Sequence, residues 1–238
     1  MRAISSMATR HVLADLAAAA ADAGLPRVSI ESVGGVDAAR RVAAGERFDL
    51  VFLAADALDR LAADGHVEGA LPLMVSQTAV AVPSGAADAA TRPTGAAYPD
   101  AAALRDALRA APRIGYSTGP SGSALVRMIE DWGLAGELGD RLVQARPGIP
   151  VARSLAAGEV SLGFQQVSEL VGAPGVRILG VLPPDCAIDT VFSGAVAATA
   201  ANPTAAHDVL AFMVSDAAAA TIAARSFRAV QTCHDPTL

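Results

Sequence analysis

The sequence predicts an α/β protein built as two lobes. Within the first 65 residues a strand, a loop and a helix alternate three times, which is typical of parallel strands joined by right-handed crossovers. Two longer β-rich runs, at residues 73–82 and 190–199, bracket a middle section with its own alternation of strands and helices. We therefore expect discontinuous lobes joined by two crossing strands, with residues 1–80 and 196–238 in lobe I and residues 81–195 in lobe II.

Three strand–helix pairs open lobe I. A short strand at Ala3-Ile4 leads through a hydroxyl-rich loop into a helix whose apolar positions recur at helical spacing, namely residues 12, 13, 16, 17 and 20. Residues 28–32 alternate like a strand, and Gly34-Gly35 opens the second helix. The run FDLVFL at residues 48–53 is typical of a strand buried on both faces, and a third helix follows it. Ligands of such sheets bind where these loops gather, at the carboxyl ends of the strands.

The most informative stretch of lobe II is residues 113–132, RIGYSTGPSGSALVRMIEDW. A strand ending at Tyr116 runs into the loop STGPSGS, which opens a helix. The first N–H groups of a helix have no partner within it and form its positive end, so glycines and hydroxyls there suit an anion. The alternative is a structural turn with a serine N-cap. The other expected elements are helices at 101–111, 151–157, 202–213 and 217–224, and strands at 142–144, 161–164 and 177–182.

Composition narrows the classes of function. Hydrophobic residues make up 53% and charged residues 18% of the chain, which indicates a globular protein. The formal net charge of −6 gives a nucleic-acid partner no electrostatic support. Lysine is absent, so any cationic partner of a bound anion is an arginine, which suits carboxylates. Cys186 and Cys233 are consistent with one disulfide or two free thiols.

Neither a membrane span nor a secretory signal is visible. No run of about twenty uncharged apolar residues occurs, and the chain starts without an apolar signal region. We therefore expect a cytoplasmic location for the chain as written, and a periplasmic one if an N-terminal segment has been removed.

The order of elements resembles the periplasmic solute-binding proteins of the type II fold, and most closely the molybdate-binding proteins among them. The resemblance spans nearly the whole chain and rests on five segments: RRVAAG at 40–45, FDLVFLAAD at 48–56, RIG at 113–115, GPSG at 119–122, and LGF at 162–164 followed by residues 176–183. It implies a ligand cleft between the two lobes.

The resemblance also implies how a ligand is held. Molybdate-group proteins use serine hydroxyls and backbone amides of the first two strand–helix loops, and often a tyrosine after the strand that resembles LGF. Ser5, Ser6 and Thr9 match the first loop, whereas Gly34 and Gly35 of the second offer only amides, and Gln166 stands at the tyrosine position. Arg10 departs from a pocket of neutral donors and suits a carboxylate. Similar-looking relatives handle small polycarboxylates, and one group isomerises trans-aconitate.

Ten residues are therefore candidates for ligand binding, and each has a structural alternative as a cap, a turn or a surface group. They are Ser5, Ser6, Thr9, Arg10, Gly34, Gly35, Ser121, Gly122, Ser123 and Gln166. No catalytic residue is identified, although His11, Tyr116 or a serine are suggestions for proton transfer. No zinc spacing, Ser-His-Asp arrangement or phosphate-binding lysine is present, so we expect no metal and no cofactor.

Three hypotheses remain open. The first is a module that closes on a small anion, an oxyanion or a small carboxylate, with an ABC permease as partner if the chain is exported. The second is an isomerase acting on an unsaturated polycarboxylate such as trans-aconitate. The third and last in rank is a ligand sensor without an output domain.

Overall fold

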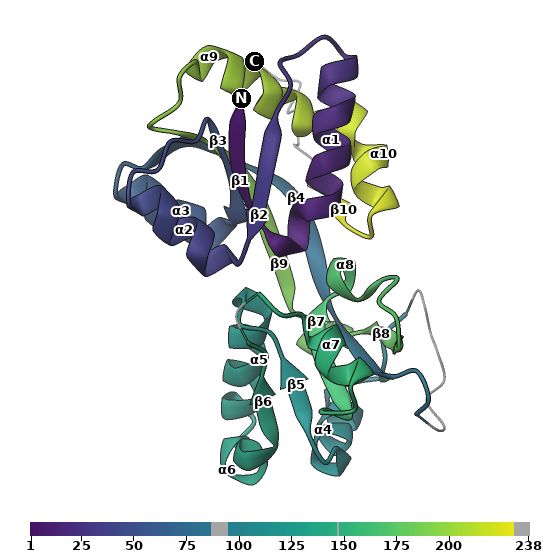
Figure 1. Ribbon diagram of the computed structural model, residues 1–238. Coiled ribbons are helices and arrows are strands. Elements are labelled where there is room, and N and C mark those ends of the chain that lie inside the picture. Colours follow the sequence, from purple (N-terminus) through teal and green to yellow (C-terminus); the bar gives the residue numbers. More distant parts are fainter. Residues whose placement is uncertain (87–94, 147, 231–238) are drawn as a thin grey trace, which may run out of the picture. The chain divides into compact units, whose positions relative to one another are not determined.

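The computed structural model describes residues 1–86, 95–146 and 148–230 (Figure 1). Within them the predicted α/β class is confirmed, since helices and strands alternate through most of the chain. The chain forms two compact units: unit 1 comprises Met1–Ser76 and Val191–Leu238, and unit 2 comprises Gln77–Thr190. Both divisions fall inside strands, β4 (Val67–Pro83) and β9 (Asp189–Ala197), which also contain the boundaries expected at residues 80 and 195.

Unit 1 is built on parallel strands with crossover helices. Strand β1 lies between β2 and β3 and pairs in parallel with both, and β3 pairs antiparallel with β9. A short strand, β10, pairs antiparallel with β4. The elements of this unit, besides its parts of β4 and β9, are β1 (Arg2–Ser6), η1 (Met7–Thr9), α1 (Arg10–Asp22), β2 (Ser29–Val33), α2 (Gly35–Ala43), β3 (Leu50–Ala54), α3 (Ala55–Ala63), α9 (Pro203–Met213), α10 (Asp216–Ala224) and β10 (Arg228–Ala229).

Strand β3 explains why the sheet of unit 1 has helices on both faces. Its residues alternate between two apolar clusters: Leu50 and Phe52 face the cluster under α1, α9 and α10, whereas Val51 and Leu53 face the cluster under α2 and α3 (Figure 1). All four are at most 1% exposed, as expected for a strand buried on both faces. Asp49, the polar residue before this strand, accepts hydrogen bonds from the backbone N–H groups of Arg2 and Ala201.

Unit 2 contains a second sheet. Strand β5 pairs in parallel with β6 and β7, and β4 pairs antiparallel with β7 and β8. The elements of this unit, besides its parts of β4 and β9, are α4 (Ala101–Ala110), β5 (Ile114–Tyr116), α5 (Pro120–Asp131), α6 (Ala135–Leu138), η2 (Gly139–Arg141), β6 (Leu142–Gln144), α7 (Val151–Ala156), β7 (Leu162–Gln166), α8 (Val167–Leu170), β8 (Val176–Val181) and η3 (Pro184–Cys186).

The second sheet is also covered on both faces. One apolar cluster gathers residues of α4 and α5, such as Leu108 and Leu125, and the other gathers residues of α7 and α8. Helix α7 approaches the sheet closely because Gly115 and Gly163, which are partners in β5 and β7, leave room for Val151. A Cβ atom at either glycine would lie within about 3.0 Å of that side chain.

Two further sequence predictions concern membrane-spanning helices and the two cysteines. No single helix in the described ranges is long and apolar enough to cross a membrane, and α9 and α10 pass that test only as a pair bent by 64°. Cys186 is half-buried and has no disulfide partner among the described residues. Cys233 lies outside them, so the predicted alternatives of one disulfide or two free thiols stay open.

Candidate functional site

Four hydroxyls gather at the carboxyl ends of β1 and β2 in unit 1, and we call them the hydroxyl cluster: Ser5, Ser6, Thr9 and Ser32. The Oγ atoms of Ser5 and Ser32 are 2.8 Å apart, which links the two strands. The Thr9 hydroxyl donates to the carbonyl oxygen of Ser6 at 3.1 Å, and the Ser6 and Thr9 hydroxyl oxygens are 3.4 Å apart. Because Thr9 uses its proton on the backbone, Ser6 is the donor in the 3.4 Å contact between the two hydroxyls, and it can donate to a ligand by giving up that long contact.

Helices α2 and α3 begin at the same edge of this sheet without a side-chain cap. Gly34 is the N-cap of α2 and Ala54 that of α3, and neither supplies a side-chain hydrogen bond to the helix. Gly35, the first residue of α2, lies against Ser6: a Cβ atom there would be 3.7 Å from the Ser6 Cβ. Of the predicted residues in unit 1, the structure thus brings Ser6, Thr9 and Gly35 together, with Gly34 next to them.

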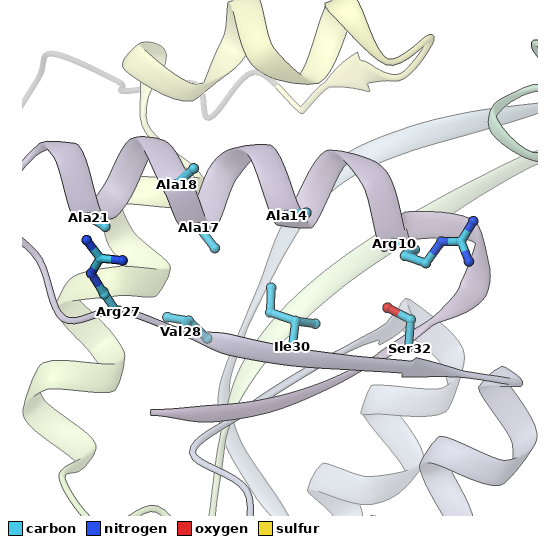
Figure 2. A pocket seen from close by; sticks show the side chains of 9 residues that line it. All are labelled: Arg10, Ala14, Ala17, Ala18, Ala21, Arg27, Val28, Ile30 and Ser32. Atoms are coloured by element: carbon cyan, nitrogen blue, oxygen red, sulfur yellow. The ribbon is translucent and has the colours of Figure 1, made fainter.

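Arg10 lies at one end of a groove in unit 1. The groove has a volume of about 350 Å³ and runs between α1 and β2, with Arg10 and Ser32 at one end and Arg27 at the other (Figure 2). Its walls are mostly apolar, formed by Val28, Ile30 and four alanines of α1. Arg10 is exposed, and its guanidinium nitrogen lies 2.9 Å from the Nε2 atom of His11, which is exposed as well.

The predicted loop of unit 2 forms the strand-to-helix turn between β5 and α5. Gly119 is the N-cap of α5 and Pro120 its first residue. Ser121 is buried, and its Oγ lies 3.1 Å from that of Ser117. Gly122 packs so tightly on the carbonyl group of Ser117 that a side chain would overlap it. Ser123 is exposed, so the structure separates it from Ser121.

Gln166 ends β7 in a buried polar environment of unit 2. Its side-chain amide nitrogen donates to the hydroxyl of Thr190 at 2.7 Å. Its carbonyl oxygen has no hydrogen-bond partner, and neither has the hydroxyl of Thr78, the residue opposite Gln166 in the antiparallel pair β4–β7. Gln166 and Thr78 are 3% and 1% exposed, so these two polar atoms are withdrawn from water. In unit 1 the buried hydroxyl of Ser76 has no partner either.

The carboxyl group of Glu169 on α8 has a raised pKa. Burial raises its pKa to about 6, although a hydrogen bond with Gln165 acts in the opposite direction. The carbonyl oxygen of that Gln165 side chain accepts from the backbone N–H of Ala152 at the start of α7. A carboxyl group with a pKa near neutrality is suited to proton transfer. No group of three His, Cys, Asp or Glu residues suited to a metal ion occurs in the described ranges.

Sequence reasoning missed four residues of these polar groups: Ser32, Thr78, Ser117 and Thr190. Thr78 belongs to a polar break, Ser76-Gln77-Thr78, inside an otherwise apolar β-rich run. Such a break in a strand buried on both faces is the one local signal that was available. Ser32 and Thr190 carry no such signal, because only the pairing of distant strands gives them their partners.

The comparisons with known proteins agree with this architecture. Residues 1–228 match the family described as bacterial extracellular solute-binding proteins. The chain belongs to this family. A curated relative, an aconitate isomerase from a Pseudomonas species, is 32% identical over 185 residues, which are 76% of this chain and 68% of that protein.

Solved structures place this solute-binding protein among two-lobed folds. The periplasmic molybdate-binding protein of Azotobacter vinelandii superimposes with a TM-score of 0.77 at 18% identity, covering 97% of this chain and 100% of that one. The substrate-binding domain of a putative molybdenum ABC transporter from Clostridium difficile gives a TM-score of 0.71 at 14% identity, covering 97% and 99%. The predicted resemblance to the type II periplasmic-binding-protein fold is thereby confirmed.

Proposed function

We propose that this solute-binding protein binds a small anion. The observation that carries the proposal is the arrangement in unit 1, where the Ser6 hydroxyl and the start of α2 lie side by side. Both offer hydrogen-bond donors, and neither brings a negative charge. This combination stabilises an anion through neutral donors and the positive end of a helix.

The only acidic residue in the first turn of α2 is Asp37, and it does not oppose this role. Asp37 forms an ion pair with Arg40 on the same helix, which compensates its charge. The first N–H groups of α2 therefore face a ligand without a competing free carboxylate. In the proposal, Ser6 and the amides of Gly34 and Gly35 contact the anion, while Ser5 and Thr9 hold the loop in shape.

In unit 2 the turn between β5 and α5 supplies the second set of donors. The hydroxyl of the buried Ser121 is the donor at the start of α5, a helix of 12 residues with no side-chain cap, whereas the N–H of Gly122 already donates to the Gly119 carbonyl oxygen.

A binding screen on the full chain tests this function. Isothermal titration with molybdate, tungstate, sulfate, phosphate and a series of di- and tricarboxylates is expected to yield at least one saturable anion. Ser6→Ala should weaken that binding about tenfold, because a hydrogen bond to a charged group contributes about 1.5–3 kcal/mol. Ser29→Ala, at an exposed serine of β2, is the matched control and should leave affinity unchanged. Absence of binding by every anion would remove the proposal.

The 32% identity with an aconitate isomerase favours a second candidate function, isomerisation of an unsaturated polycarboxylate. Such a reaction takes a proton from the carbon next to one carboxylate and returns a proton at the other end of the allylic system. Arg10 is the arginine of the first loop suited to a substrate carboxylate. Incubation with trans-aconitate in D₂O, followed by proton NMR, should then show both cis-aconitate and deuterium in the substrate. If the protein binds trans-aconitate but exchanges no proton, the isomerase function is excluded and the anion-binding function remains.

Partner and location separate the two functions further. A transport receptor works outside the cytoplasm and delivers its ligand to an ABC permease, whereas the isomerase function is compatible with a cytoplasmic location. Cell fractionation of the native protein, with a cytoplasmic and a periplasmic marker as controls, distinguishes them. Co-purification with a permease only in the presence of the anion would support transport.

A further inference from the structure

Two buried polar atoms of unit 2 have no partner, and they lie on neighbouring strands. The Gln166 carbonyl oxygen is one, and the Thr78 hydroxyl is the other. Thr78 and Gln166 are directly opposite each other in the antiparallel ladder, so their side chains project from the same face with Cβ atoms about 5 Å apart. Leaving one such atom buried and unpaired costs about 1–3 kcal/mol, so two at one spot call for an explanation.

The backbone around these residues does not supply the missing bonds. The N–H of Thr78 donates to the carbonyl oxygen of Ile188, and its own carbonyl accepts from Leu182, so the main chain at Thr78 is already fully paired. The Thr190 hydroxyl holds the amide nitrogen of Gln166 at 2.7 Å, which directs the carbonyl end of that amide elsewhere. The carbonyl oxygen is therefore the end of the Gln166 amide that has no hydrogen-bond donor.

The chemistry of the missing partner follows from the two groups. A carbonyl oxygen only accepts, whereas a threonine hydroxyl both donates and accepts. Among the groups that small anions carry, a hydroxyl satisfies both, because its hydrogen goes to Gln166 and its lone pair accepts from Thr78. Fully deprotonated molybdate, tungstate and sulfate carry no hydrogen, so each would leave the Gln166 carbonyl unpaired.

We propose that Gln166 and Thr78, with Thr190 as the positioning residue, form a subsite that selects an anion bearing an O–H group. This inference rests on the proposed anion-binding function and names its ligand class. The ligand is a hydroxy acid or a hydrogen-bearing inorganic anion, since the two share the same hydrogen-bond pattern. A site built around an O–H group discriminates strongly against an analogue without it, because buried polar atoms then stay unpaired.

Matched ligand pairs test this selection on the full chain at pH 8 by isothermal titration. Malate and succinate differ by one hydroxyl, as do citrate and tricarballylate, and hydrogen phosphate keeps an O–H that sulfate lacks. We expect the O–H member of at least one pair to bind about tenfold more tightly than its partner. A preference within the organic pairs identifies a hydroxy acid, whereas a preference for phosphate over sulfate identifies the inorganic anion.

Single substitutions test whether the side chains of the subsite cause the preference for the O–H member of a pair. Gln166→Met removes the acceptor and should bring the two affinities of a pair to within about twofold. Thr78→Val removes a hydroxyl that can donate to either member of a pair, so it should weaken the binding of both members. Thr190→Val releases the amide and should reduce the preference without removing it. Thr204→Val, at an exposed position of α9, is the matched control and should leave the preference intact. Thermal unfolding of each variant verifies that it is folded, and Gln166→Leu takes the place of Gln166→Met if that variant does not fold.

The outcomes separate this inference from the function on which it rests. Anion binding with equal affinity inside every pair, or a preference that Gln166→Met leaves unchanged, overturns the subsite and leaves anion binding in place. Failure of all anions to bind overturns both.

Discussion

The polar residues at the strand ends of the two units are buried to a similar degree, but their hydrogen bonds differ. In unit 1, Ser5, Ser6 and Thr9 are at most 7% exposed, and each bonds to a neighbour in the hydroxyl cluster or to the backbone. In unit 2, Thr78 and one end of Gln166 are equally withdrawn from water and have no partner. The first arrangement holds a loop in shape by itself, whereas in the second two buried polar atoms are left without a hydrogen bond.

The largest effect is expected from Gly122→Ala in unit 2. The added methyl group would overlap the carbonyl oxygen of Ser117, which belongs to the backbone and cannot swing away. We expect the free energy of unfolding to fall by about 3 kcal/mol, the upper end for overpacking, measured by urea denaturation. Ala124→Gly on the same helix is the comparison, with a loss of about 1 kcal/mol from helix propensity alone. Equal losses in the two variants would mean that the turn adapts.

Glu169→Gln should change how stability depends on pH. The folded-state pKa of about 6 lies above the ordinary value of 4.5 for a glutamate, so the folded protein holds the proton more tightly than the unfolded chain. This contribution to stability is therefore complete below pH 4.5 and is lost as the pH rises through 6. The variant should abolish that decline and be more stable above pH 6 by about 2 kcal/mol, measured by denaturation across pH 4–8. Parallel pH profiles for the two proteins would contradict the raised pKa.

Two threonine-to-valine changes should have opposite signs. Thr9→Val loses the hydrogen bond to the Ser6 carbonyl oxygen and should destabilise unit 1 by about 1 kcal/mol. Thr78→Val removes a buried hydroxyl that has no partner and should stabilise the ligand-free protein by about 1 kcal/mol. Thermal unfolding without ligand measures both changes. A loss of stability in both variants would show that the Thr78 hydroxyl has a partner after all.

The smallest effect is expected from Gly35→Ala in unit 1. The added Cβ atom meets the Ser6 Cβ at 3.7 Å, an ordinary contact, and the backbone there is not in the left-handed region. The free energy of unfolding should change by less than about 0.5 kcal/mol, in contrast to Gly122→Ala. The same urea titration compares them, and a large loss at Gly35 would mean that α2 starts in a tighter environment than the contacts indicate.

Much of the fold was predictable because its signals are local. The nearly continuous apolar run at residues 48–53 predicted a strand buried on both faces, and β3 is such a strand. The loop before Ala124 predicted the start of a helix, and α5 begins there. Some predicted ends differ from those of the structure. Strand β4 begins at Val67, whereas the sequence predicted a start near Leu73, because residues 67–72 are largely exposed and lack an apolar pattern.

The candidate site was predictable only in part. Hydroxyl-rich loops after strands pointed to Ser6, Thr9 and Ser121, since parallel strands bring their carboxyl ends to one edge. The roles of the ten candidates as ligand contacts stay predictions. Ser123 entered the set through its place in the loop, yet it is exposed on the helix, because side chains one and two positions apart on a helix point in different directions.

The sequence by itself determined the order of strands and helices and the places where hydroxyls and glycines begin a helix, because these depend on residues close together in the chain. Only the tertiary structure decided that Gln166 bonds to Thr190 and lies opposite Thr78, and that Ser5 meets Ser32. Those partners are set by the register between distant strands. Register depends on the packing of whole faces of a sheet, which local periodicity does not encode.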